Sequence, residues 1–181
     1  MTGTRTARRR LRNDRGDVPP DPSVLNTTVL SNFAYIDELW VVADLSGICT
    51  VPVVREELEN GVGDHPYLQP ALDILDDDEI PIARISDTVA NREAIVRDHL
   101  DPGEAQAFAL ADAHDGRLLT DDGDARSFAK EQGVTVVGSV GVLLAAINAG
   151  KITEQTADEW LSTWIDEIGY YVPYRNIAAY R

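Results

Sequence analysis

Acidic and amide side chains stand in this sequence at points where strands are expected to end or helices to begin. Asn26 lies within or just after the first expected strand, and Glu57 lies on the short helix expected after the second. Glu104 opens the helix before the fourth expected strand, and the acidic run 121–124 follows that strand directly. Converging carboxylates repel one another and need a hard cation, which for oxygen ligands means Mg²⁺ or Mn²⁺. Such an ion can orient a phosphodiester, activate water and stabilise the leaving oxygen.

Each of these residues also has a purely structural interpretation. Asp101 can cap a helix with Glu104 closing a capping box. Glu57 stands in a run of carboxylates of the kind that usually face water. The run 121–124 suits a loop and a helix N-cap. Because the chain contains 31 acidic residues, accidental clusters are expected, and the spacing alone leaves both interpretations open.

The elements that must position these side chains alternate between strand and helix patterns. The sequence predicts strands over residues 24–29, 48–51, 80–85, 117–120 and 134–137. It predicts helices over residues 31–45, 52–61, 68–76, 87–100, 102–114, 125–132, 139–148 and 153–168. Strands separated by helices indicate right-handed crossovers and a parallel sheet covered on both faces, which is an α/β fold. In such sheets a site lies beyond the carboxyl ends of the strands, where the strand order reverses.

Several segments, taken in order, resemble the PIN-domain family. They are VLNTTVLSNF (24–33), VVREELENG (53–61), GEAQA (103–107), LTDD (119–122) and the following DAR (124–126). The segments 138–144 and 168–172 resemble the end of one prokaryotic branch of PIN-like proteins related to VapC toxins. The similarity covers about residues 24–175. It implies a three-layer α/β/α sandwich with a parallel sheet of about five strands, and a Mg²⁺- or Mn²⁺-dependent ribonuclease.

The resemblance also assigns roles to individual residues. The four acidic positions of the family fall on Asn26, Glu57, Glu104 and Asp122, with Asp121 and Asp124 as alternatives for the last. Supporting hydrogen bonds are expected from Thr27, Thr120 and Ser139, although Ser139 is more simply read as a helix N-cap. Arg126 is expected to contact phosphate or to pair with a neighbouring acid. The implied partners are RNA, a cognate antitoxin and a second copy of the chain.

Asn26 departs from the family pattern, which has Asp at this position. An amide can ligate through its carbonyl oxygen, but it adds no negative charge and cannot accept a proton as a base. Metal affinity should therefore drop. Three interpretations remain open: a weak nuclease, a catalytically silent module that binds RNA or a protein, and a site rebuilt around the run 121–124.

The charge and composition of the chain indicate the solution conditions and the partners to expect. The net charge is −15, and only two of the 16 basic residues are lysines, which suggests adaptation to concentrated salt. Such a charge argues against nucleic-acid partners at low salt, but concentrated salt screens the repulsion. The single cysteine, Cys49, is expected to be a small buried hydrophobe, and Trp160 and Trp164 are expected to pack in the core or in a dimer contact.

The N-terminal composition and the apolar stretches of the chain predict its domain bounds and its location in the cell. Residues 1–23 carry six arginines and three aspartates and are expected to form a disordered tail, with a basic arm that touches RNA as the alternative. The folded domain is expected over residues 24–181. The sequence contains no export signal and no apolar stretch near the ~20 residues of a membrane span, so a cytoplasmic protein without a membrane partner is expected.

Overall fold

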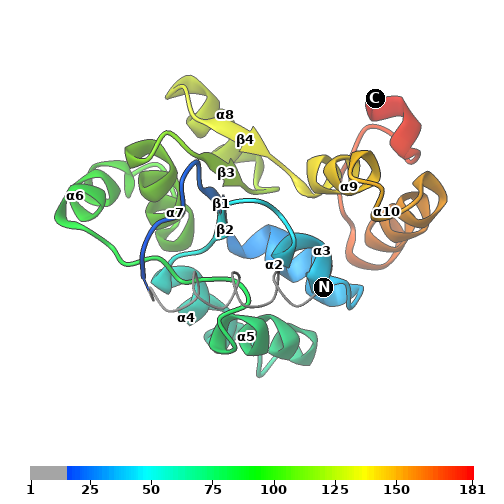
Figure 1. Cartoon of the computed structure of the whole chain (residues 1–181), viewed down its shortest axis with the longest axis horizontal. Helices are drawn as coiled ribbons and strands as arrows, with labels where there is room; N and C mark the ends of the chain where they lie inside the picture. Colours follow the sequence, from blue (N-terminus) through cyan, green and yellow to red (C-terminus); the bar gives the residue numbers. More distant parts are fainter. Residues whose placement is uncertain (1–15) are drawn as a thin grey trace, which may run out of the picture.

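The structure is a computed structural model that describes residues 16–181. Within these residues four short parallel strands form one sheet in the order β2–β1–β3–β4 (Figure 1). The strands are β1 (Ser23–Leu25), β2 (Ile48–Cys49), β3 (Arg117–Leu119) and β4 (Thr135–Val137). Val24 is in register with Cys49 of β2 on one side and Leu118 of β3 on the other. The prediction of a parallel α/β fold is confirmed, with four strands rather than about five.

The strand predicted over residues 80–85 is reduced to one isolated bridge between Thr50 and Ile82. The Thr50 N–H donates to the Pro81 carbonyl at 2.9 Å, and the Ala83 N–H donates to the Thr50 carbonyl at 2.9 Å. Pro81 has no N–H to contribute to a ladder, so this segment lies along the β2 edge without extending the sheet.

The helices begin earlier than predicted after β1. The strand prediction over 24–29 is too long, because Asn26 caps helix α2 (Thr27–Tyr35) and ends β1 at Leu25. The single helix predicted over 31–45 is two helices, α2 and α3 (Leu39–Ala43), separated by a turn in which Asp37 has φ 58°.

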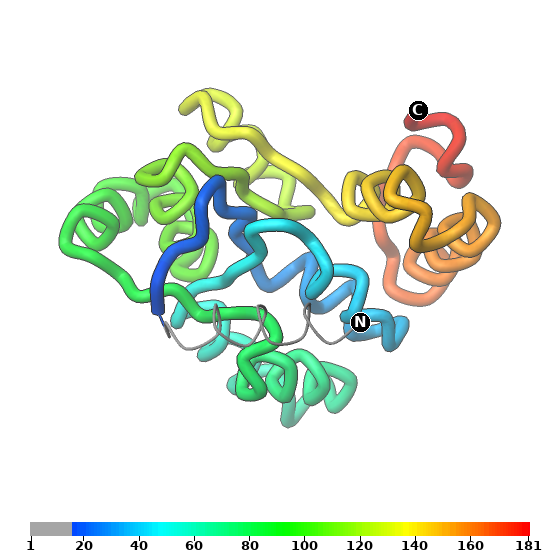
Figure 2. The backbone as a smooth tube through the Cα atoms, in the orientation of Figure 1, coloured from blue at the N-terminus to red at the C-terminus, as the bar shows by residue number. Residues whose placement is uncertain are grey.

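The remaining helices follow the predicted positions closely. They are α4 (Pro52–Gly61), α5 (Gln69–Asp76), α6 (Asp87–Val96), α7 (Pro102–Ala113), α8 (Gly123–Glu131), α9 (Ser139–Asn148) and α10 (Glu154–Ile168), with short 3₁₀ turns η1 (Pro66–Leu68) and η2 (Ile177–Tyr180). Helix α7 packs on β1 and β3 and is covered by α6 and α4, whereas α9 contacts β4, α3 and α10 (Figures 1 and 2). The sheet therefore lies between helical layers.

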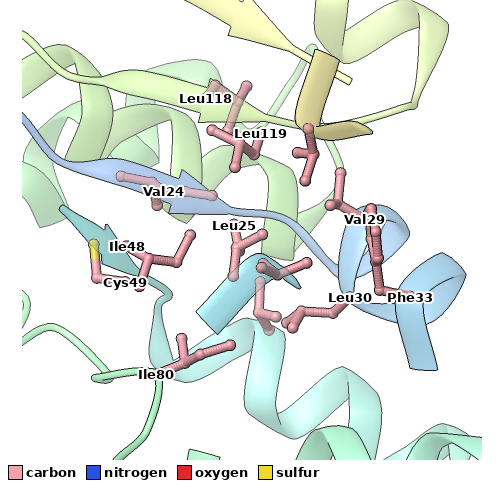
Figure 3. Close-up of a cluster of buried hydrophobic side chains, with 14 of the residues drawn as sticks. Val24, Leu25, Val29, Leu30, Phe33, Ile48, Cys49, Ile80, Leu118 and Leu119 are labelled. Carbon is pink, nitrogen blue, oxygen red and sulfur yellow. The ribbon is translucent and has the colours of Figure 1, made fainter. Parts of the chain in front are cut away.

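The hydrophobic core lies between the sheet and these helices. Val24, Leu25 and Leu118 are fully buried together with side chains of α2, as Figure 3 shows. Cys49 is also buried, which raises the pKa of its thiol to about 12, and this confirms the prediction of a small buried hydrophobe. Trp164 is fully buried and packs edge-on against Phe33 with ring centroids 5.1 Å apart, so the predicted core packing of Trp164 is confirmed.

The described part of the predicted N-terminal tail lies along the domain. The Gly16 carbonyl accepts a hydrogen bond from the Arg84 N–H at 2.8 Å, and the Pro22 carbonyl accepts one from the Arg117 N–H at 2.8 Å. Ser23 already belongs to β1. The rest of the tail prediction, residues 1–15, lies outside the described residues. None of the helices in residues 16–181 has the length and apolar character needed to cross a membrane.

Candidate active site

Two residues mark the point where the strand order reverses. The chain runs from β1 to β2 on one side and returns to β3 on the other, so the reversal lies between β1 and β3. Asn26 follows β1 and Thr120 follows β3, both at the carboxyl ends of their strands. Ligand sites of open parallel sheets form beside such a reversal. The candidate site is built around this pair.

Asn26 is held by hydrogen bonds at both ends of its amide. Its side chain is 1% exposed. Oδ1 accepts a hydrogen bond from the Thr27 N–H at 2.8 Å, and Nδ2 donates to Thr120 Oγ1 at 3.0 Å. Asn26 is therefore the N-cap of α2 and joins the ends of β1 and β3.

Glu57 projects from α4 toward the start of α7. Its Oε1 accepts a hydrogen bond from the Gly103 N–H at 2.9 Å, and its Oε2 accepts one from the Thr27 hydroxyl. A Cβ on Gly103 would lie 2.4 Å from Glu57 Oε1, so glycine is the residue that leaves room for the carboxylate. The hydroxyl of Thr27, predicted to support the site, acts on Glu57.

Glu104 lies at the start of α7 and is 8% exposed. Its Oε2 accepts a hydrogen bond from the Asp101 N–H at 3.2 Å, which closes the predicted capping box. Burial raises the pKa of the Glu104 carboxyl to about 7, and the negative charge of Asp122 adds to the rise. The charges of Asp101 and Glu57 raise the Glu104 pKa further. Glu104 therefore caps a helix and also responds to acids from two other elements.

Asp122 follows β3 and is the N-cap of α8. Its Oδ1 accepts a hydrogen bond from the Ala125 N–H at 2.9 Å, and its own N–H donates to Thr120 Oγ1 at 3.2 Å. The Thr120 hydroxyl thus accepts from both Asn26 and Asp122. Thr120 is fully buried, and it fixes Asn26 and Asp122 relative to each other.

Asp121 has a different role from its neighbour. Its Oδ1 accepts from the Ser139 N–H and the Tyr170 hydroxyl, each at 2.8 Å, and its Oδ2 accepts from Asn32 Nδ2 at 2.8 Å and from the Ser139 hydroxyl. Its N–H donates to Thr28 Oγ1 at 2.9 Å. Four donors satisfy this carboxylate, which therefore ties β3, α9, α2 and the C-terminal segment together.

The prediction that Ser139 caps α9 is wrong, because Gly138 is the N-cap and Ser139 is the first helical residue. The Ser139 side chain turns to Asp121 instead. Sequence reasoning missed Thr28, Asn32 and Tyr170 as members of this network. Thr28 and Asn32 lie inside the first family-like segment and Tyr170 inside the last, and the position in those segments was the available signal.

The remaining two predicted residues lie at the start of α8. The Asp124 side chain is exposed and makes no hydrogen bond or ion pair with residues 16–181. Arg126 donates from Nη1 to the Thr120 carbonyl at 3.0 Å and forms no ion pair within the described chain. A Cβ on Gly138 would lie 2.7 Å from Arg126 Nη1, so the guanidinium packs against the start of α9.

The carboxylate oxygens of the site are the ligand type that a hard divalent cation prefers, but the described side chains are not arranged around a common point. Among residues 16–181, no group of three or more His, Cys, Asp or Glu side chains lies in a position to hold a metal ion together. Glu104 Oε1 and Asp122 Oδ2 nevertheless accept no hydrogen bond from a described residue. Both oxygens reach solvent, since no buried side-chain oxygen or nitrogen in the described part lacks a partner. Open carboxylate oxygens under mutual repulsion fit the ligand type and charge that Mg²⁺ or Mn²⁺ prefers.

Comparison with known proteins gives one match and one negative result. A family model described as a PIN domain matches residues 22–180. This span includes every strand of the sheet and all the candidate site residues. No curated protein matches the chain significantly.

Proposed function

Because the chain belongs to the PIN-domain family, we propose that it is a metal-dependent endoribonuclease that hydrolyses RNA phosphodiesters at the carboxyl edge of its sheet. One observation carries the proposal. The pKa of Glu104 is raised first by burial, then by the negative charge of Asp122 and, to a smaller extent, by that of Glu57, and these two acids come from different elements of the fold. Acids that act on one another in this way form the kind of site at which a divalent cation is stabilised.

Glu57, Glu104 and Asp122 would hold Mg²⁺ or Mn²⁺ through their carboxylate oxygens. A bound ion of this kind supplies positive charge to the phosphate and lowers the pKa of the attacking water. Thr27 and Gly103 fix the Glu57 carboxylate, and Thr120 fixes the backbone at Asp122. These hydrogen bonds orient two of the three acids before substrate arrives.

Arg126 is the residue proposed to bind the phosphate. Its guanidinium is oriented by the Thr120 carbonyl at the end of β3 and forms no ion pair with a carboxylate of the described chain. A guanidinium can donate two parallel hydrogen bonds to phosphate oxygens. We place the scissile phosphate between Arg126 and the three carboxylates.

A second candidate function, a catalytically weak or silent PIN module that binds RNA or a protein, is favoured by Asn26. Its amide is neutral, and both its polar atoms serve hydrogen bonds inside the protein. The acidic set then has three charges instead of four, which weakens the attraction for a hard cation. The two candidates differ in whether the natural chain cleaves RNA.

Incubating the full chain with RNA in Mn²⁺ at high salt separates them. We expect weak cleavage that EDTA abolishes, that Glu57→Gln and Glu104→Gln both remove, and that Glu56→Gln leaves intact. Glu56 is the matched control, because it is the exposed neighbour of Glu57 on the same helix. Cleavage that persists in EDTA would reject the metal mechanism.

The silent module would give a different result in the same experiment. In that case the natural chain would not cleave RNA, whereas Asn26→Asp would. A role as a VapC-like toxin component, with an antitoxin and a homodimer as partners, stays a prediction from the resemblance. So does adaptation to salt.

A further inference from the structure

The segment after α10 is anchored directly in the candidate site. Gly169 ends α10 in a left-handed conformation, with φ 68°. The Tyr170 N–H then donates to the Trp164 carbonyl at 3.0 Å, and the Tyr170 hydroxyl donates to Asp121 Oδ1 at 2.8 Å. The Tyr170 ring also packs edge-on against Trp164, with centroids 5.6 Å apart. Tyr170 is thus fixed at both its backbone and its side chain.

Tyr171, the next residue, projects into solvent. It is 92% exposed, more than any other large hydrophobic residue in the described chain, and it makes no hydrogen bond or ring contact there. Consecutive Cα atoms lie about 3.8 Å apart, so the Tyr171 backbone is held one residue away from the side chain that reaches Asp121. An exposed aromatic ring that follows an anchored residue and has no partner among the described residues is suited to an external ligand with a flat face.

We propose, on the basis of the proposed function, that Tyr171 stacks on a nucleobase of single-stranded RNA and thereby places the adjoining phosphate at Arg126 and the carboxylates. Unpaired bases expose their faces to aromatic side chains, whereas bases in a duplex do not. Tyr171 is a positioning residue in this scheme, since it acts on the base and not on the reacting atoms.

The charge of the protein supports stacking as the source of affinity. With 31 acidic and 16 basic residues and a net charge of −15, the chain as a whole does not attract an RNA backbone. Stacking of a base on an aromatic ring is worth about 1–3 kcal/mol and does not depend on charge. Affinity carried in this way survives concentrated salt, whereas affinity carried by phosphate contacts is lost as salt rises.

The test measures binding separately from cleavage. Fluorescence anisotropy of a labelled single-stranded RNA is recorded with the full chain in EDTA and again in Ca²⁺, and KM is measured in Mn²⁺. We expect Tyr171→Ala to weaken binding or raise KM by about 5- to 150-fold, the range that corresponds to loss of one stacked base. We expect kcat to stay within about twofold, and Tyr171→Phe, which keeps the ring, to behave as the natural chain.

Trp40→Ala is the matched control. Trp40 is 41% exposed, but it lies on α3. This helix leads into the start of β2 and therefore toward the amino ends of the strands, whereas the candidate site lies at their carboxyl ends. We expect this variant to bind RNA normally. Replacing bases of the RNA by abasic sites should remove the difference between the natural chain and Tyr171→Ala.

Three results would contradict the inference. If the natural chain cleaves RNA and Tyr171→Ala has the same affinity and KM, stacking by Tyr171 is rejected while the nuclease proposal stands. If Tyr171→Ala changes only the oligomeric mass in light scattering, the ring belongs to a protein interface. If the natural chain neither binds nor cleaves RNA, the proposed function fails and the inference with it.

Discussion

The carboxylate of Glu57 lies directly against the backbone of Gly103, whose N–H donates to Glu57 Oε1 at 2.9 Å. Through this contact Glu57 is held by the first turn of α7, the helix that carries Glu104. The positive end of the α7 dipole faces the Glu57 carboxylate. The glycine of the GEAQA segment is thereby explained by its neighbour on α4.

Gly103→Ala is expected to reduce cleavage without unfolding the protein. The added Cβ would lie 2.4 Å from Glu57 Oε1, and the flexible carboxylate is the group that must move. Alanine also favours the helix. We expect kcat/KM for RNA in Mn²⁺ to fall by about tenfold or more, in line with misplacement of a catalytic group, while the melting temperature stays the same or rises.

Gly123→Ala provides the control for that substitution. Gly123 also opens a helix beside an acid of the site, but a Cβ there would meet nothing within 4 Å. The activity of Gly123→Ala should match that of the natural chain. Equal activity of Gly103→Ala and Gly123→Ala would show that the position of Glu57 is unimportant.

Asn26→Asp is expected to strengthen metal binding and to increase cleavage. Aspartate can cap α2 as asparagine does, and the Thr120 hydroxyl can donate to it instead of accepting. The extra charge raises the ligand charge to that of the family pattern. We expect Mn²⁺ to raise the melting temperature of the variant by more than that of the natural chain.

Asn60→Asp adds the same charge at an exposed position at the end of α4 and serves as the comparison. It should leave the Mn²⁺ response unchanged. An identical Mn²⁺ titration for Asn26→Asp and the natural chain would mean that residue 26 lies outside any metal site.

The pKa of Glu104 predicts a pH dependence of stability in metal-free buffer. Its folded-state value of about 7 lies above the ordinary value of 4.5, so the folded protein holds the proton more tightly. The contribution is complete below about pH 4.5 and is lost as the pH rises through about 7. The melting temperature of the natural chain should therefore fall by a few degrees more than that of Glu104→Gln between pH 5 and pH 8. Parallel curves for the two proteins would contradict a raised pKa.

Asp121→Ala is expected to destabilise the fold more than any other acid-to-alanine change in the run 121–124. It leaves four donors without their acceptor, and we expect the free energy of unfolding to fall by about 3 kcal/mol or more in urea denaturation. Asp124→Ala, at an exposed position without contacts, should change it by less than about 1 kcal/mol. If Asp121→Ala lowers the free energy of unfolding as little as Asp124→Ala does, the Asp121 network contributes nothing to stability.

The alternation of strands and helices was sufficient to predict the α/β architecture and most helix positions. The bounds of α9 follow from its apolar pattern, and α7 follows from its capping box. The segment 80–85 has the β-rich composition of a strand, but Pro81 has no N–H for a ladder and the pairing is limited to one bridge. The break between α2 and α3 was missed because the apolar spacing continues through Asp37, whose left-handed conformation depends on the local turn.

The sequence predicted Asn26 within or just after a strand and Asp121 and Asp122 after another, and the structure shows all three following strands. The hydrogen bonds that each of them makes could not be predicted. Sequence order brought Asp121 and Asp122 to the same strand end, yet only tertiary contacts assign the first to a structural network and leave an oxygen of the second open. Tyr170 lies 49 residues from its partner Asp121, a separation that no local pattern reports. Spacing likewise could not show that the Asn26 amide is committed to Thr27 and Thr120.

The central place of β1 has a consequence for how the protein is made. Among the described strands, β1 is the first to leave the ribosome, but Leu118, the partner of Val24, is synthesised 94 residues after it, and Tyr170 emerges later still. At elongation rates of about 5–20 residues per second, the chain spends several seconds without its central pairing. Asp122, the last of the three acids proposed to bind the metal, follows β3, so the proposed site cannot assemble on a nascent chain that still lacks this strand.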